Sequence, residues 1–159
     1  MTDSPDTSNE RAARIDFYTL SERYPGDRFQ FACRLIAKVR GQGLRVVVHC
    51  PRVDEARAFD RLLWSFDLGS FIPHGLIGRV DVALTPVLIS PNGEPESEHQ
   101  VLVNLALEAP PFFSRFQRVC ELVDQTPEVL AAGRRRWNWY KGQACRLEHH
   151  WIHKDARGD

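Results

Sequence analysis

The adjacent pair His49–Cys50 is the combination in this sequence best placed for nucleophilic chemistry. It ends the apolar, β-branched segment LRVVVHC (44–50), which is typical of a buried strand. Open α/β sheets place their sites at the carboxyl ends of strands, where a histidine could activate a neighbouring thiol. The pair has no recognisable nucleophile turn and no orienting acid. We therefore interpret it as a core thiol beside a hydrogen-bonded histidine, with an α/β enzyme as an alternative.

Metal ligands could come from a second group near the end of the sequence, which contains Cys145, His149, His150 and His153. His149 and His153 have the spacing of two ligands on one helical face. No CxxC motif accompanies them, so we interpret them as surface and partly buried side chains and expect no metal site.

Phosphate-binding loops are the third chemistry that an α/β sequence invites, because helix N-termini can face phosphates. The sequence contains neither GxxxxGK[ST] nor GxGxxG, and GQG (41–43) follows a predicted helix instead of a strand. We therefore expect no nucleotide, and no cofactor of any kind.

The strongest local signal is RRRWNWYKGQACRLEHHW (134–151), where aromatic and basic residues alternate. On a helix, Arg134, Trp137 and Lys141 would share one face with Leu130, giving an apolar groove with a basic edge. Such a surface suits single-stranded nucleic acid, through stacking and phosphate contacts. It equally suits an acidic peptide with an apolar last residue, or it is an ordinary solvated helix face.

Large apolar residues also occur in LLWSFDLGSFIPHGL (62–76), beside residues that form turns. Trp64 would end a helix, whereas Phe71 and Ile72 follow DLGS and are harder to bury. Exposed aromatics held by a turn are typical of interface hot spots. Packing of these residues back onto the core is the alternative.

The elements that would position these residues alternate between strands and helices. We predict strands at 14–20, 44–50, 81–90 and 100–107, and helices at 27–41, 55–66, 109–124 and 126–144. Asp27 is a candidate N-cap and Pro127 a candidate first helical residue, and the tail at 145–154 should pack on the domain. This order predicts an α/β fold with three layers, in which a mainly parallel central sheet carries helices on both faces. It is Rossmann-like but lacks a nucleotide-binding loop.

Composition limits the remaining possibilities. Residues 14–154 are expected to form a single α/β domain between a disordered N-terminal tail (1–13) and a flexible C-terminus (155–159). The 21 basic and 21 acidic residues cancel, so net charge gives no argument for nucleic-acid or membrane binding. No apolar run could span a membrane and no signal peptide is recognisable, so we expect a cytoplasmic protein with four buried, reduced cysteines.

Four segments together resemble a known family. They are FYTL (17–20), GLRVVVHC (43–50), LLWSFDLGSFIPHGL (62–76) and RRRWNWYKGQACRLEHHW (134–151). In order and spacing they are similar to the chi subunit family of bacterial DNA polymerase III, and the similarity covers residues 14–154.

This resemblance implies a non-catalytic accessory subunit in DNA replication that joins two protein partners. One is the psi subunit of the clamp loader. The other is the acidic, phenylalanine-terminated tail of single-stranded DNA-binding protein, through which DNA is reached indirectly. The residues implied for psi are Trp64, Phe71 and Pro73, and those implied for the tail are Arg134, Trp137, Tyr140 and Lys141.

The sequence departs from the family pattern at two positions of the tail site. Where the family has further lysines, this chain has Leu130 and Asn138. The electrostatic part of the site is expected to be weaker, and Arg135 or Arg136 could compensate.

Overall fold

The computed structural model describes residues 12–66, 72–78, 80–81, 84–90 and 100–153. Within these ranges the helices are α2 (Arg28–Gly41), α3 (Val53–Phe66), α4 (Pro127–Lys141) and the short 3-10 helix η2 (Phe113–Arg115). The strands are β1 (Ala13–Leu20), β2 (Val46–His49), β3 (His74–Leu76), β4 (Val87–Ser90), β5 (Val101–Asn104), β6 (Arg118–Val123) and β7 (Cys145–Ile152). The predicted flexible ends lie outside the described residues, except for Ala12 and Ala13.

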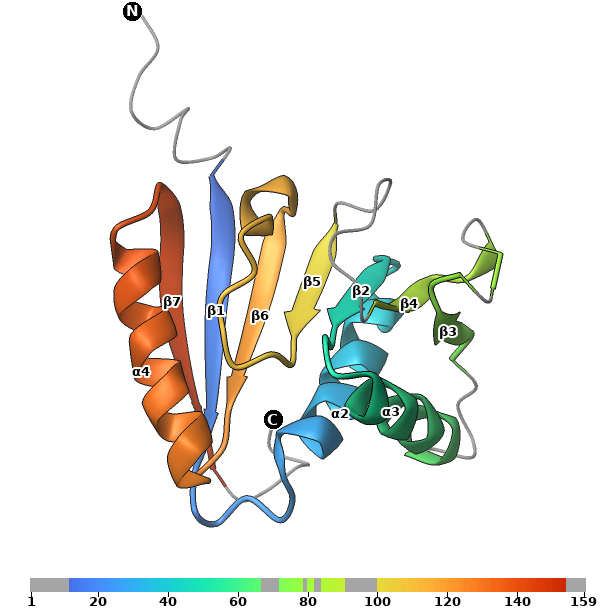
Figure 1. The fold of residues 1–159 in the computed structure, drawn as a ribbon, viewed down its shortest axis with the longest axis horizontal. Coiled ribbons are helices and arrows are strands. Elements are labelled where there is room, and N and C mark those ends of the chain that lie inside the picture. Colours follow the sequence, from blue (N-terminus) through green and yellow to red (C-terminus); the bar gives the residue numbers. More distant parts are fainter. Residues whose placement is uncertain (1–11, 67–71, 79, 82–83, 91–99, 154–159) are drawn as a thin grey trace, which may run out of the picture.

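All seven strands form one parallel sheet in the order β3-β4-β2-β5-β6-β1-β7. β1 lies between β6 and β7, with Ile15 opposite Val119 on one side and Leu147 on the other. β3 and β7 are therefore the two edges, at opposite ends of the sheet (Figure 1). The predicted parallel α/β architecture is confirmed.

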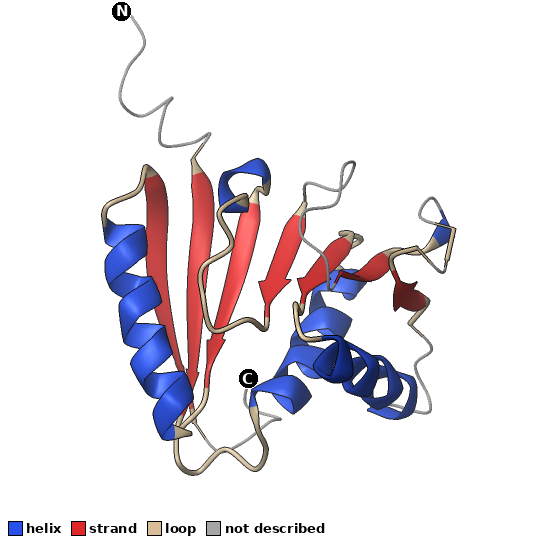
Figure 2. Cartoon of the chain, in the orientation of Figure 1, coloured by secondary structure: helices blue, strands red, loops and turns tan. Residues whose placement is uncertain are grey.

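Helices cover both faces of the sheet, which gives the three predicted layers (Figure 2). On one face α2 and α3 bury Phe31, Ile36 and Phe59 against the strands. On the other face α4 packs over β1 and β6, while residues 112–116 cover β2 and β5. Because side chains alternate along a strand, β1 contributes Ile15 and Phe17 to the α4 face and Tyr18 and Leu20 to the α2 face.

Local sequence signals account for the ends of two helices. Asp27 caps α2 as predicted: its side chain accepts from the Gln30 backbone, and the Gln30 side chain accepts from the Asp27 N–H. Pro127 occupies the first turn of α4, also as predicted. Thr126 stands at the N-cap of α4 but makes no side-chain capping hydrogen bond.

The predicted helix at 109–124 is wrong. Residues 113–115 form the 3-10 turn η2, and residues 118–123 form the central strand β6. A parallel strand covered on both faces carries apolar residues at odd and even positions, so its pattern can imitate helical spacing. Here Val119 and Val123 face α4, whereas Cys120 and Leu122 face α2.

Several strands differ from the sequence prediction, and β2 and β5 are shorter than the strands predicted at 44–50 and 100–107. The strand predicted at 81–90 is limited to β4, and β3, within the turn-rich segment 62–76, was not predicted. The tail at 145–154, which was predicted only to pack on the domain, forms β7, an edge strand paired with β1.

The cysteines are free thiols. Cys33, Cys50 and Cys120 are buried, as expected, whereas Cys145 is half-buried. Among the described residues, the helices are too short or too polar to cross a membrane.

Candidate functional site

A groove of about 630 Å³ runs between α4 and the strands β1 and β7. We call it the α4 groove. Its floor comes from the α4-facing side chains of the two strands and its wall from one edge of the helix. The lining residues used below are Phe17, Leu130, Arg134, Trp137, His149 and Trp151.

The helix presents two different stripes to its surroundings. Val129, Ala132, Arg136 and Tyr140 recur at intervals of three or four residues and are buried against the sheet. A second stripe, rotated by about 100°, places Leu130, Arg134 and Trp137 along the groove.

Gly133 lets α4 approach β6 closely. A Cβ atom at this position would lie 2.8 Å from a methyl carbon of Val123, closer than side chains pack. The glycine therefore sets the depth at which the groove wall sits over the sheet.

Aromatic rings form a continuous floor. The Trp137 ring meets Phe17 edge-on at 5.2 Å between centroids and His149 at 6.1 Å. His149 in turn lies 6.0 Å from Trp151, whose side chain is about half exposed. Edge-to-face and tilted contacts of this kind hold the rings in defined positions.

Positive charge is supplied by α4. Arg134 lines the groove, whereas Arg135 and Lys141 are exposed elsewhere on the helix, and no carboxylate pairs with these three among the described residues. The described lining of the groove includes no Asp or Glu. The arrangement can accept an apolar side chain on the aromatic floor and an anionic group at Arg134.

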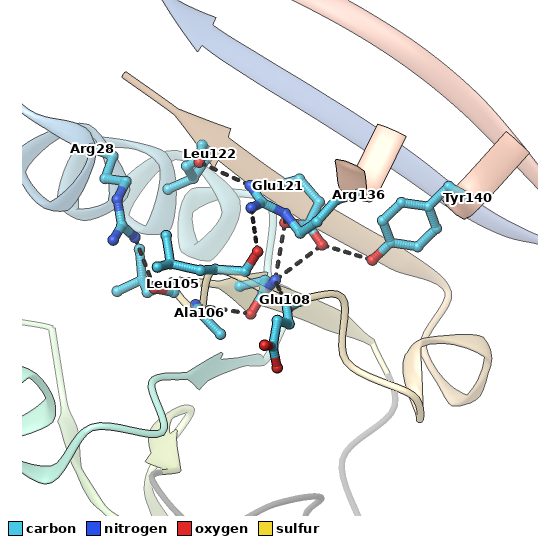
Figure 3. A network of polar contacts seen from close by, with 10 residues as sticks. Arg28, Leu105, Ala106, Glu108, Glu121, Leu122, Arg136 and Tyr140 are labelled. Carbon is cyan, nitrogen blue, oxygen red and sulfur yellow. Dashed lines mark hydrogen bonds and ion pairs between the residues drawn. The ribbon is translucent and has the colours of Figure 1, made fainter. Parts of the chain in front are cut away.

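A buried polar network fixes α4 to the sheet (Figure 3). The Glu121 carboxylate, fully buried on β6, accepts from Arg136 Nε at 2.8 Å and from the Tyr140 hydroxyl at 2.6 Å. Asn104 donates to both carboxylate oxygens at 3.0 Å. Arg136 also donates to the Leu107 carbonyl at 2.8 Å, so every charge in the network is compensated.

The network also fixes protonation states. Burial raises the pKa of Glu121, and the neighbouring Arg136 guanidinium opposes that rise. Burial and the charge of Glu121 raise the pKa of Tyr140, so its hydroxyl remains a hydrogen-bond donor. These groups stabilise the position of the helix and do not face the groove.

The four residues implied for tail binding are therefore not all brought together. Arg134 and Trp137 line the α4 groove, and Lys141 is exposed one turn beyond Trp137. Tyr140 is fully buried and donates to Glu121, so it faces away from the groove. Arg136 is also buried and cannot supply compensating surface charge, which leaves Arg135 for that role.

Sequence reasoning missed His149 and Trp151 as groove residues because the tail was not recognised as a strand. The signal was available in the alternation of CRLEHHWI, in which Cys145, Leu147, His149 and Trp151 share a face. The position of Tyr140 could similarly be inferred from its helical spacing to Val129 and Arg136.

Two of the residues implied for psi binding, Trp64 on α3 and Pro73 just before β3, belong to elements at the other end of the sheet (Figure 1). Trp64 is 52% exposed and Pro73 is exposed. Phe71 lies outside the described residues. Trp64 rests on the His74 imidazole at 4.7 Å between ring centroids.

His74 holds this corner together. One ring nitrogen lies 2.7 Å from the Ile72 carbonyl oxygen, and the other lies 3.2 Å from the Asp60 carbonyl oxygen on α3. The buried ring thereby joins α3 to the start of β3 and supports the exposed Trp64 indole.

His49 and Cys50 have the properties of core residues. Cys50 is fully buried, and burial raises the pKa of its thiol to about 12, so the nucleophilic thiolate is scarce near neutral pH. Burial lowers the pKa of His49, whose ring packs edge-on against Phe112. Its buried Nδ1 has no hydrogen-bond partner among the described residues, so the expectation of a hydrogen-bonded histidine is wrong at this atom.

Two groups of side chains contain potential metal ligands. Cys145 donates to the Tyr140 carbonyl and His149 bonds the Thr19 hydroxyl, both as parts of a strand, so the helical His149/His153 spacing does not exist. Among the described residues, Asp16, Glu148 and His150 have ligand atoms within 4.8 Å of one another. The guanidiniums of Arg14 and Arg118 already bond Asp16 there and would repel a cation.

Comparison with known proteins gives a consistent result for this sequence. Residues 13–148 match the family model described as DNA polymerase III chi subunit, HolC. A curated DNA polymerase III subunit chi from Pseudomonas aeruginosa is 40% identical over 138 residues, covering 86% of this chain and 95% of the relative. The subunits chi of Haemophilus influenzae and Escherichia coli are 28% and 27% identical, covering 86% and 70% of this chain and 95% and 77% of theirs.

Solved structures with a similar fold are more distant in sequence. T4 UvsW is 12% identical with a TM-score of 0.64, over 90% of this chain and 42% of that chain. Domain 2 of the DEAD-box helicase Mss116p, bound to an RNA duplex, is 11% identical with a TM-score of 0.56, over 85% of this chain and 63% of that chain. At this level of identity the likeness concerns the α/β fold alone.

Proposed function

The chain belongs to the DNA polymerase III chi subunit family, and from that membership we propose that it is a non-catalytic adaptor of the replication machinery. It links the clamp loader, through psi, to the acidic C-terminal tail of single-stranded DNA-binding protein. It acts in the cytoplasm, at the replicating DNA, and contacts that DNA indirectly through single-stranded DNA-binding protein. The observation that carries the proposal is the α4 groove, which combines an aromatic floor with Arg134 and has no carboxylate in its described lining.

The groove suits both parts of such a tail. A terminal phenylalanine side chain would pack on Trp137 and Trp151, and its α-carboxylate would pair with Arg134. Acidic residues upstream would meet Arg135 and Lys141 along the exposed side of α4. Tyr140 supports this site from behind, because its bond to Glu121 fixes the helix that carries the other residues.

The two departures from the family pattern make this groove more apolar. Leu130 and Asn138, which stand where further lysines are implied, both line it. We expect the apolar contact with the last residue of the peptide to supply more of the affinity, and ionic contacts less.

The second partner would dock at the opposite end of the sheet. Trp64, supported by His74, and the exposed Pro73 would meet psi, together with Phe71. Exposed aromatic residues on a rigid support are typical of interface anchors. Two separate surfaces allow one molecule to hold the clamp loader and a protein-coated strand together, which raises their local concentration.

The proposal is tested by calorimetry with the tail peptide, with and without its final phenylalanine. Removing the phenylalanine should weaken binding at least about tenfold, because the aromatic floor loses its occupant. Arg134→Ala should weaken the intact peptide about tenfold and Trp137→Ala about thirtyfold, and circular dichroism checks that both variants fold.

Trp64→Ala is the matched control, since it also removes an exposed indole but far from the groove. It should bind the tail peptide with wild-type affinity and fail to bind psi. Wild-type tail affinity in both Arg134→Ala and Trp137→Ala would overturn the assignment of the site.

A further inference from the structure

A second groove lies on the α2 face of β1 and β7, opposite the α4 groove, and the proposed function does not use it. We call it the α2 groove. Its volume is about 600 Å³, similar to that of the α4 groove. The lining side chains that matter here are Arg14, Tyr18, Arg34, Lys38, Arg118 and His150.

The groove exists because the sheet extends beyond its helix. α2 packs against α3, β2 and β6. On this face α2 reaches β1 at Phe31, whose ring lies 5.5 Å from that of Tyr18 between centroids, and Figure 1 shows α2 lying toward β2. The flank of α2 forms one wall of the groove, and the outer part of β1 with β7 forms the other.

Positive charge exceeds negative charge in this groove. Four cationic side chains line it (Arg14, Arg34, Lys38 and Arg118), and His150 lies beside them. The acids on this part of the sheet are Asp16, which is buried, and Glu148, which lies 3.6 Å from Arg14. Lys38 is exposed one helical turn after Arg34 and has no ion-pair partner among the described residues.

The cations on the strands are held in fixed positions. Asp16 accepts from Arg118 Nε at 2.9 Å, from Arg14 Nε at 3.1 Å and contacts His150 Nε2 at 2.9 Å. Arg118 also donates to the Tyr18 hydroxyl, and the His150 ring stacks on Tyr18 at 4.8 Å. Guanidinium groups that are already oriented lose less freedom on binding an anion than flexible ones do.

Apolar walls accompany the charges. Leu35 and Val39 of α2 and Ile152 of β7 line the same groove. An inorganic anion would not need these surfaces, whereas a sugar or base attached to a phosphate could contact them. Asp16 and Glu148 offset two of the four positive charges, so positive charge still remains for an anion, and guanidinium pairs readily with phosphate oxygens.

We propose that the α2 groove binds the phosphate groups of nucleic acid, as a single strand laid between α2 and β7. The chemistry recognised is a nucleotide phosphate, which a free nucleotide also carries. Because the α2 and α4 grooves use opposite faces of the same strands, a nucleic-acid strand and a peptide could be held simultaneously.

The test is fluorescence anisotropy of the full chain with a labelled oligothymidylate at several salt concentrations. Lys38→Glu should weaken binding about tenfold, because a contact to phosphate becomes a repulsion. Lys38→Gln should reduce the slope of log K against log salt by about 0.7, the value for one phosphate contact on a single strand. Lys38 is exposed, so neither variant should affect folding.

Two charge reversals on other helices serve as comparisons. Arg57→Glu, on the exposed side of α3, should leave oligonucleotide binding unchanged. Lys141→Glu should also leave it unchanged; a loss equal to that of Lys38→Glu would place the strand on the α4 face and overturn the proposal. Absence of binding by the wild-type chain at low salt would overturn it as well.

Competition identifies the source of the phosphate. Displacement of the oligonucleotide by its own unlabelled form, but not by ATP at equal phosphate concentration, supports the single strand. Equal displacement by ATP would retain the phosphate site but overturn the single strand as its ligand. Because Lys38→Glu should still bind the tail peptide normally, failure of this inference is distinguishable from failure of the proposed function.

Discussion

The two faces of the β1–β7 pair carry very different side chains. On the α4 face, Phe17, His149 and Trp151 make an aromatic floor. One residue along, on the α2 face, Tyr18 and His150 stand among arginines. The two-residue period of a strand allows adjacent positions to belong to unrelated surfaces, so function cannot be assigned to a stretch of sequence as a whole.

A buried carboxylate also lies on each face of this half of the sheet, Glu121 of β6 on the α4 face and Asp16 of β1 on the α2 face, and the two have different partners. Glu121 is enclosed by Arg136, Tyr140 and Asn104 in a network that reaches no groove. Asp16 is bonded by Arg14, Arg118 and His150, whose outer sides line the α2 groove. One network fixes a helix, and the other presents cations to solvent.

The largest predicted effect tests whether the Glu121 network fixes α4, and it follows from removal of Arg136. Arg136→Met should lower the free energy of unfolding by about 3–5 kcal/mol, because it leaves the Glu121 charge buried without its partner. Chemical denaturation measures this change. Arg135→Met removes an exposed neighbouring arginine and should alter stability by no more than about 0.5 kcal/mol. Equal effects of the two variants would show that the Glu121 network does not hold α4.

The next effect concerns Asp16 and pH. Burial raises the pKa of Asp16, but hydrogen bonds from His150 and Arg14 and the charge of Arg118 outweigh it, so the pKa lies below the usual 3.8. A lowered pKa stabilises the fold above the unfolded-state pKa, and this contribution is lost as pH falls through the folded-state value. At pH 7, Asp16→Asn should therefore cost about 1.5–3 kcal/mol.

Denaturation of the wild type and Asp16→Asn over a range of pH checks this expectation. The difference between them should shrink once the pH falls below about 4. A difference that stays constant down to pH 2 would mean that the ionised carboxylate is not what stabilises this face. The pKa of Glu121 is raised, so protonation of this carboxyl should increase the free energy of unfolding as the pH falls, opposite to the effect of Asp16.

The smallest predicted effect concerns the affinity of the α4 groove for the tail peptide. Lys141 is exposed beyond the groove, so Lys141→Ala should weaken binding of the tail peptide by about fivefold at most. The loss should disappear at high salt, since exposed charges are screened. A loss of affinity that persists at high salt in calorimetry would mean that Lys141 binds the peptide through more than a screened, exposed ion pair.

Much of the fold follows from local patterns. The helices α2, α3 and α4 were predictable from helical spacing, with Asp27 and Pro127 marking two of their starts. The strand β6 was not, because burial on both faces removes the alternation that identifies a strand. β3 carries only three residues, too few for any period to be visible.

The site was predictable only where a side chain's direction follows from its own helix. Arg134 and Trp137 lie together as their spacing implied. Tyr140 does not join them, because its helical spacing places it on the buried stripe with Val129 and Arg136; only its partner Glu121, nineteen positions earlier, was not predictable from the helix. The contributions of His149 and Trp151 depend on the pairing of β7 with β1, which no local pattern encodes.

The position of β1 has a consequence for the order of folding. This early strand has its two neighbours far along the chain, with Arg14 beside both Arg118 and Arg146. Closing such long loops costs chain entropy before any contact is gained, and parallel pairing over these separations is slow. We expect the half of the sheet that carries both grooves to form last, which pulse-labelled hydrogen exchange would detect as late protection of β1 and β7. Early protection of β1 would contradict this order.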